Sequence, residues 1–384
     1  MTKHSSVAEP ITDRLSALSR ELNPAWAKLP TYVAGLSEEA VRARYGLAHV
    51  IKLASNENPL GPGPAAREAI RRAADVASRY PDTQELEAAL CRRLGIEASQ
   101  LTLTSGSSEA LDLLARVVLD SNSEAVAPNP SFILYPIVVQ ATGARLRSVP
   151  TRPDWSVDLD AVAAAITPAT RLVLLGNPNN PTGLWHRTGE LIQFLERVPA
   201  NVLVVLDEAY FEYVSEPDYP NGITLLPRFP NLVVLRTFSK VHGLAGLRVG
   251  YSVSHPLIAD TIKRARPPFN VNTIAVGAAL AALDDDAHVR SSIALNRTQR
   301  IALSDALSTR GIRVVSSAAN FVAAELGPDV SNIVEALLRM GVIVRPIGSM
   351  SGFVRITIGT EVENQALLTA LDQARVGPFP AGPT

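Results

Sequence analysis

Residues 202–206 read Val-Leu-Val-Val-Leu, and Asp207-Glu208-Ala209-Tyr210 follow them directly. Such an unbroken apolar run does not alternate between buried and exposed positions, as a strand with one wet face would. It is typical of a strand that is buried on both faces, in the interior of a parallel sheet. The stretch therefore predicts a central strand that carries a polar turn at its carboxyl end.

Further apolar runs surround this strand, and helical patterns separate them. The runs lie at 101–104, 125–127, 145–149, 171–175, 232–236 and 249–253, and the helical patterns at 107–119, 131–142, 158–166, 187–197 and 255–265. Strands that alternate with helices form parallel sheets, and the helices cover both faces. The sequence thus predicts an α/β fold with a mainly parallel sheet covered by helices on both faces.

The pattern differs at the two ends of the chain. Residues 1–50 read as an arm with a short helix at 38–45, which Ser37 can cap. A short strand at 51–54, a helix at 64–79 and a second helix closed by Gly95 follow, with Asp82 and Glu85 as its capping box. After residue 270, long helices precede short strands at 312–315, 320–325, 342–344 and 353–358, with helices at 329–340 and 361–375. We therefore expect an arm at 1–50, a large domain at 51–270 and a smaller α+β domain at 271–384.

The composition excludes several classes of protein. The chain has 384 residues, 47% of them hydrophobic, and its formal net charge is −1 from 36 basic and 37 acidic residues. A nucleic-acid-binding or membrane-surface protein would carry a basic face, so neither partner is expected. The only cysteine, Cys91, excludes an internal disulfide and a cysteine-rich zinc site, and no metal is expected. No apolar run is long enough for a membrane span and no signal peptide is evident, so we expect a cytoplasmic location.

Polar residues follow the predicted strands where each of them ends. Residues 105–109 read Ser-Gly-Ser-Ser-Glu, residues 176–183 read Gly-Asn-Pro-Asn-Asn-Pro-Thr-Gly, and residues 237–240 read Thr-Phe-Ser-Lys. Taken singly, these are ordinary helix caps, turns and a solvated lysine. Ligands of open α/β sheets, however, bind at the carboxyl ends of the strands, so the set as a whole indicates a site.

The set contains the parts that a phosphorylated pyridine aldehyde requires. Ser107 and Ser108 open a helix, whose N–H groups and positive dipole end suit a phosphate. Asp207 could pair with a ring N–H, and Lys240 could form an imine with the aldehyde. Amines are scarce in this chain, because its lysines are Lys3, Lys28, Lys52, Lys240 and Lys263.

Four motifs, in this order along the chain, resemble a known family. They are residues 54–59 (Ala-Ser-Asn-Glu-Asn-Pro), 177–183, 207–210 and 239–250 (Ser-Lys-Val-His-Gly-Leu-Ala-Gly-Leu-Arg-Val-Gly). They resemble fold-type I pyridoxal-phosphate (PLP) aminotransferases, and most of all histidinol-phosphate aminotransferases, over residues 24–375. The resemblance implies a transfer of an amino group between histidinol phosphate and 2-oxoglutarate in histidine biosynthesis, with PLP as the cofactor.

The resemblance also implies roles for the cofactor-binding residues. Lys240 would be the Schiff-base lysine and would move the proton, while Asp207 would face the pyridine nitrogen and keep it protonated. Asn180 and Tyr210 would contact the phenolic oxygen of the ring, and Phe132 would stack on it. The phosphate would be held by residues of two loops and a helix start, Gly106, Ser107, Ser108, Ser239 and Arg248.

The same resemblance places residues at the substrate and at a second subunit. Arg355 would grip the α-carboxylate of the substrate beside Asn180, since a planar guanidinium suits a carboxylate. Arg345 and Tyr32 would meet its distal phosphate. Tyr80 would reach the cofactor phosphate of the neighbouring subunit, which implies a homodimer with shared active sites. The N-terminal arm would pack with the small domain and with the partner subunit.

Two segments at the substrate end depart from the family pattern, and they leave the substrate open. Residues 30–35 lack two prolines of the usual arm motif, and residues 346–354 form a short connection. An aromatic amino-acid aminotransferase, or a PLP-dependent decarboxylase of the threonine-phosphate type, would share the cofactor residues. A non-enzymatic sensor would be expected to lack the lysine or the aspartate, and both are present. A nicotinamide dehydrogenase would need a Gly-x-Gly-x-x-Gly turn, which the chain lacks.

Overall fold

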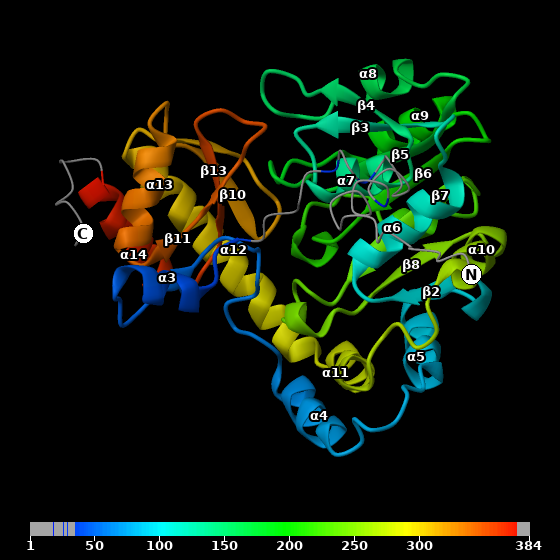
Figure 1. Cartoon of the computed structure of the whole chain (residues 1–384), viewed down its shortest axis with the longest axis horizontal. Helices are drawn as coiled ribbons and strands as arrows, with labels where there is room; N and C mark the ends of the chain where they lie inside the picture. Colours follow the sequence, from blue (N-terminus) through cyan, green and yellow to red (C-terminus); the bar gives the residue numbers. More distant parts are fainter. Residues whose placement is uncertain (1–17, 19–25, 27–28, 30–34, 375–384) are drawn as a thin grey trace, which may run out of the picture.

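The structure is a computed structural model that describes residues 18, 26, 29 and 35–374. It contains two layered parts (Figure 1). The large unit is built on a seven-stranded sheet, and the small unit on a four-stranded sheet. The long helix α12 (Asp286–Thr309) runs from the large unit into the small one. Within the described positions, no helix is long and apolar enough to cross a membrane.

The sheet of the large unit is mainly parallel, as predicted. Its strand order is β2-β8-β7-β6-β5-β3-β4, and only β8 runs antiparallel to its neighbours. The strands are β2 (Leu101–Thr104), β3 (Glu124–Asn129), β4 (Arg145–Pro150), β5 (Thr170–Gly176), β6 (Leu203–Asp207), β7 (Leu232–Thr237) and β8 (Gly250–Ser254). Strand β6, the apolar run that begins at Val202 in the sequence, lies in the middle of the sheet. Its carboxyl end is Asp207.

Helices cover both faces of this sheet. Successive residues of its strands point to opposite faces, and each face has its own hydrophobic core. Val205 belongs to a core with α6 (Ser107–Val118), α7 (Leu134–Ala141) and α10 (Pro256–Ala265). Val204 and Leu206 belong to the opposite core, which is covered by α5 (Gln84–Leu94), α8 (Leu159–Ala164), α9 (Thr188–Arg197) and α11 (Thr273–Leu283). This arrangement confirms the α/β fold class predicted from the unbroken apolar runs.

Helix α11 was expected in the smaller domain, yet its side chains lie in the core of the large unit. Its buried alanines, among them Ala275 and Ala279, join the core that contains Val204. It also packs against α4 (Pro64–Ala74), as the lower part of Figure 1 shows. The change of sequence pattern after residue 270 therefore reflects the end of the strand–helix alternation. The division of the chain at that point stays a prediction.

Two local predictions in this region differ from the structure. Helix α4 ends at Ala74 instead of continuing to residue 79. Helix α5 has Thr83 as its N-cap, and Asp82 accepts a hydrogen bond from the Gln84 N–H (3.0 Å) instead of forming a capping box with Glu85. Gly95 does close α5 in the left-handed conformation, as expected.

The small unit combines an antiparallel sheet with three helices. Its strand order is β12-β13-β10-β9, from β9 (Arg313–Val315), β10 (Phe321–Glu325), β12 (Arg345–Pro346) and β13 (Phe353–Thr357). Helices α12, α13 (Val330–Arg339) and α14 (Glu361–Ala374) cover it through a core that includes Leu307, Leu337 and Leu367. The β12 strand was not predicted.

Two elements that precede the large unit in the sequence, a helix and a short strand, belong to the small unit. Helix α3 (Glu38–Tyr45) is capped by Ser37 as predicted, and its Val41 packs against Leu338 and Ile343. Strand β1 (Ile51–Lys52) pairs in parallel with β11 (Val342–Ile343). The segment that follows, residues 54–58, therefore passes between the two units.

A buried ion pair fixes the carboxyl ends of β6 and β7. The Glu208 carboxylate accepts hydrogen bonds from Nε (3.0 Å) and Nη2 (2.8 Å) of Arg236, and from the Gly222 N–H (2.8 Å). The Arg236 guanidinium lies 3.5 Å from the centroid of the Phe211 ring. A β-carbon on residue 222 would lie 2.9 Å from the Glu208 carboxylate, so only glycine fits there. Each of the two buried charges therefore has a partner of opposite sign.

We expect Glu208→Gln to destabilise the fold by about 3 to 5 kcal/mol, because it leaves the buried Arg236 charge without its hydrogen-bonded carboxylate partner. Chemical denaturation followed by circular dichroism measures this loss. The matched control is Glu196→Gln, which removes the exposed ion pair with Arg228 and should cost less than about 1 kcal/mol. Equal losses in the two variants would contradict a structural role for the buried pair.

Candidate active site

Most of the side chains expected at the strand ends lie at one edge of the large sheet. Asp207 is the last residue of β6, and Lys240 follows the end of β7. The segment at residues 54–58 and strand β13 of the small unit approach the same place, since Lys240 donates to the Ser55 carbonyl (3.4 Å) and Arg355 to the Ala54 carbonyl (2.8 Å). The candidate site thus lies where the two units meet.

Asp207 is a buried carboxylate whose charge is only partly compensated. Its side chain is 6% exposed, and it accepts hydrogen bonds from the Ala209 N–H (3.2 Å) and the Tyr135 hydroxyl (3.4 Å). Burial raises the pKa of Asp207 to about 6, although both hydrogen bonds and the Lys240 charge oppose the rise. A cationic N–H donor would stabilise the ionised carboxylate here more than these neutral donors do.

Lys240 is a partly buried lysine whose amine loses its proton more readily than that of an ordinary lysine. Burial, together with the guanidinium groups of Arg355 and Arg248, lowers its pKa to about 8, against the opposing effects of Glu57 and Asp207. The Nζ atom lies 5.7 Å from the centroid of the Tyr210 ring. The depressed pKa gives a larger fraction of neutral, nucleophilic amine near neutral pH than an ordinary lysine has.

An anion cradle forms where α6 begins. Ser107 is the first residue of this helix, and its N-cap is Gly106, with φ of 77°. Arg248 folds over this turn, so that a β-carbon on residue 106 would lie 2.4 Å from Nη2 of Arg248. Arg248 also donates to the Ser239 hydroxyl (3.3 Å). A helix N-terminus, a guanidinium and hydroxyl groups together suit a phosphate.

Arg355 reaches from the small unit to the large one. Its Nη1 donates to the Asn180 side-chain oxygen (2.6 Å). Its positive charge helps to lower the pKa of Lys240 and opposes the rise that burial causes in the pKa of Tyr210. Arg345 lies directly opposite Arg355 in the β12–β13 ladder. Residues opposite each other in an antiparallel pair share one face of the sheet. Both arginines therefore face the same side of the small sheet.

Two expected residues lie at the border of this group or outside it, and a third is not among the described residues. Phe132 is half-buried, and its ring packs edge-on against Tyr135 with 5.8 Å between centroids. Tyr80 is 80% exposed and stacks on Phe269 with 4.3 Å between ring centroids. Tyr32 lies outside the described residues.

Two residues at the site were missed by reasoning from the sequence. Tyr135 is buried in α7 and donates to the Asp207 carboxylate (3.4 Å), and its place three residues after Phe132 in the sequence was the available signal. Asn56 lies inside a motif quoted for the resemblance, yet it was given no role. Its side chain donates to the Tyr210 hydroxyl (2.8 Å).

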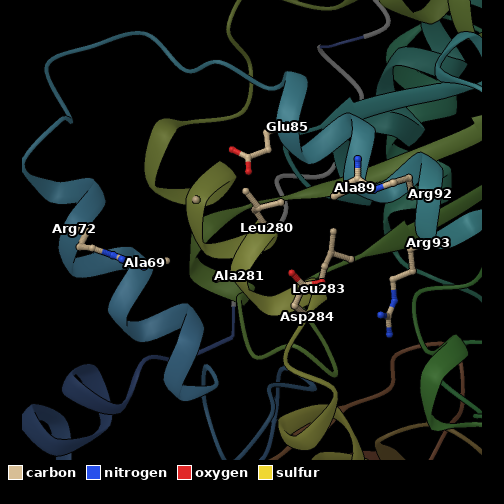
Figure 2. A pocket seen from close by; sticks show the side chains of 11 residues that line it. Ala69, Arg72, Glu85, Ala89, Arg92, Arg93, Leu280, Ala281, Leu283 and Asp284 are labelled. Atoms are coloured by element: carbon tan, nitrogen blue, oxygen red, sulfur yellow. The ribbon is translucent and has the colours of Figure 1, made fainter.

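A hollow lies elsewhere, between α4, α5 and α11 (Figure 2). Its volume is about 670 Å³, and it is lined by Leu280 and Ala281 of α11, Arg72 of α4 and Glu85 of α5, among others. None of the expected site residues lines it. Across the described part of the chain, no group of three or more His, Cys, Asp or Glu side chains could hold a metal ion.

Comparisons with known proteins identify the family. The family model described as aminotransferase class I and II matches residues 48–371. Histidinol-phosphate aminotransferase 1 of Nitrosococcus oceani is 45% identical over 358 residues, which cover 90% of this chain and 96% of that protein. Histidinol-phosphate aminotransferase 2 of Pseudomonas aeruginosa is 46% identical over 354 residues, covering 91% of this chain and 96% of that protein.

Solved structures agree with this match. The histidinol-phosphate aminotransferase of Sinorhizobium meliloti, solved in complex with pyridoxal-5′-phosphate, superposes with a TM-score of 0.86 at 31% identity and covers 94% of this chain and 98% of its own. An aspartate aminotransferase of Thermus thermophilus, a double mutant, superposes with a TM-score of 0.78 at 25% identity and covers 92% of this chain and 99% of its own. The resemblance inferred from the motifs is confirmed, and the chain belongs to the aminotransferase class I and II family.

Proposed function

We propose that this aminotransferase moves the amino group of histidinol phosphate to 2-oxoglutarate, with PLP as cofactor, as a step of histidine biosynthesis. The relatives that bear this name cover almost the whole chain, and none of the names quoted above favours an aromatic aminotransferase or a decarboxylase. The observation that carries the proposal is the placement of the Lys240 amine and the buried Asp207 carboxylate at one sheet edge, each with its pKa moved toward neutrality.

The residues present fit the cofactor. The cradle at Gly106 and Ser107 would take the phosphate, together with Ser108, Ser239 and Arg248. Phe132 would stack on the ring, and Asn180 and Tyr210 would contact its phenolic oxygen. When bound, PLP supplies an electron sink for the charge that develops on the α-carbon of the substrate.

The chain's own groups would handle the protons. Lys240 would hold the cofactor aldehyde through its amine and, once released by the substrate, accept the proton from the α-carbon. Its pKa near 8 lets it serve as a base and then as an acid at neutral pH. Asp207 would keep the ring nitrogen protonated, and the Tyr135 hydroxyl would hold the carboxylate in place.

Charged side chains from the small unit would bind the substrate. Arg355 would pair with the α-carboxylate of 2-oxoglutarate and of glutamate, which would compete with the Asn180 oxygen for its guanidinium. Arg345, on the same side of the small sheet, would meet the distal phosphate with Tyr32. We further propose a cytoplasmic homodimer in which Tyr80 serves the partner's site. The exposed stack of Tyr80 on Phe269 supports a contact with a second copy.

We expect PLP to attach to the apoenzyme faster as the pH rises, with a midpoint near pH 8 instead of the 10.5 of an ordinary lysine. The lowered pKa leaves the Lys240 amine neutral above about pH 8, and only the neutral amine is nucleophilic. Stopped-flow absorbance measures the rate, and borohydride reduction with peptide mapping locates the attachment. Labelling of Lys52 or Lys263 in place of Lys240 would refute the assignment.

We expect Asp207→Asn to lower the rate of the half-reaction with the amino donor by at least about a hundredfold, because the preorganised charge beside the ring is lost. Single-turnover absorbance measures the rate. Asp160→Asn, an exposed carboxylate paired with Arg197, is the control and should react normally. Near-normal rates in Asp207→Asn would exclude the proposed role of the carboxylate.

A panel of amino donors with 2-oxoglutarate tests the substrate. Histidinol phosphate is expected to have a kcat/KM at least about tenfold above histidinol, phenylalanine and tyrosine, since a charge-assisted contact with Arg345 adds roughly 1.5 kcal/mol or more. Arg345→Met should remove most of the preference for the phosphorylated donor. Equal specificity constants for histidinol phosphate and phenylalanine would favour an aromatic aminotransferase instead.

A further inference from the structure

Asn56 occupies an unusual position between the two units. It is 1% exposed, and its backbone adopts φ of +56°, a left-handed conformation that asparagine tolerates better than most residues. Its backbone carbonyl accepts a hydrogen bond from the Asn320 amide (2.9 Å), and its N–H donates to the Thr357 hydroxyl (2.9 Å). Both partners belong to the small unit, so Asn56 is held from that side.

Thr357 fixes the orientation of the Asn56 amide. Its Oγ1 accepts from the Asn56 N–H and donates its own proton to the Asn56 side-chain oxygen (3.3 Å). Because the oxygen of the amide faces Thr357, the NH₂ group faces the Tyr210 hydroxyl, to which it donates (2.8 Å). An amide NH₂ can only donate. The Tyr210 oxygen is therefore the acceptor in this contact, and its own proton is directed elsewhere.

We propose that Asn56 is a positioning residue that sets the direction of the Tyr210 O–H bond, so that this hydroxyl donates its proton to the phenolic oxygen of the cofactor. The inference rests on the proposed function, in which Tyr210 contacts that oxygen. It also makes the orientation depend on the small unit, because Thr357 is the last residue of β13, the strand that carries Arg355. The same strand would thus bind the substrate and orient the cofactor contact.

Other groups around Tyr210 do not supply this orientation. Burial raises its pKa to about 12, Arg355 and the Asn56 hydrogen bond oppose the rise, and Asp207 adds to it. Tyr210 is therefore protonated at neutral pH and able to donate. Its ring packs edge-on against Phe321, with 5.1 Å between centroids, and Lys240 Nζ lies over the ring.

Asn56→Asp tests the proposal because it keeps the shape and the left-handed backbone but turns the donor into an acceptor. The Tyr210 proton would then be drawn to residue 56 and away from the cofactor. A donor to the phenolic oxygen favours its ionised form, so losing that donor raises the pH midpoint of the bound cofactor's absorbance, by about 1 to 2 pH units. The new negative charge raises the midpoint as well, and a double-mutant cycle with Tyr210→Phe separates the two effects.

Four holoenzymes are titrated by absorbance: wild type, Asn56→Asp, Tyr210→Phe and the double variant. We expect Tyr210→Phe to raise the midpoint and Asn56→Asp to raise it by clearly less in the Tyr210→Phe background than in the wild type. Equal shifts of Asn56→Asp in both backgrounds would overturn the inference and leave the proposed function intact. No shift in Tyr210→Phe would instead refute the cofactor contact of Tyr210, and with it the inference.

A neutral pair of variants gives a second, independent readout. Thr357→Val removes the hydroxyl that orients the amide, and Thr357→Ser keeps it. Thermal melting of the holoenzymes confirms that both are folded. A larger upward shift of the midpoint in Thr357→Val than in Thr357→Ser supports the inference, and equal midpoints in the two would count against it.

Discussion

The candidate site depends on the Lys240 amine and the buried Asp207 carboxylate, which lie close enough for each charge to act on the pKa of the other. Burial penalises both charges, so the pKa of Lys240 falls to about 8 and the pKa of Asp207 rises to about 6. At a solvated surface neither group would have such a shifted pKa, and both would be fully charged at neutral pH. The central strand β6 and its neighbour β7 produce this burial, because their carboxyl ends lie at the interior of a covered sheet.

Holding two such groups requires rigid support from the layers around them. The Glu208–Arg236 pair, directly behind Asp207, keeps the ends of β6 and β7 in register without leaving a free charge. On the other side, the segment at residues 54–58 accepts hydrogen bonds from Lys240 and from Arg355. The site is therefore shared between the two units, and changes in their packing reach the cofactor-binding groups directly.

Much of the fold could be predicted from the sequence because local patterns determine it. The unbroken run at 202–206 identified a central strand, and strand–helix alternation identified the covered sheet. The end of α4 at Ala74 and the placement of α11 in the large core depend on tertiary packing, which periodicity does not report. A two-residue strand such as β12 is too short for any pattern to reveal it.

The residues of the candidate site also fall into those that the sequence could predict and those that it could not. Lys240, Asp207 and the phosphate cradle lie at or just after the ends of strands, and this placement could be recognised in the sequence. Asn56 and Tyr135 act through contacts with residues distant in sequence, Tyr210 and Asp207, and only the folded chain brings these together.

The central claim is that the Asp207 carboxylate keeps the cofactor ring cationic beside the Lys240 amine. Nitrogen-15 NMR of the enzyme loaded with ring-labelled PLP tests it most directly. The account predicts a protonated ring nitrogen in the wild type across the neutral and mildly alkaline range, and loss of that proton in Asp207→Asn. An unprotonated ring nitrogen in the folded wild-type enzyme at neutral pH would contradict the account.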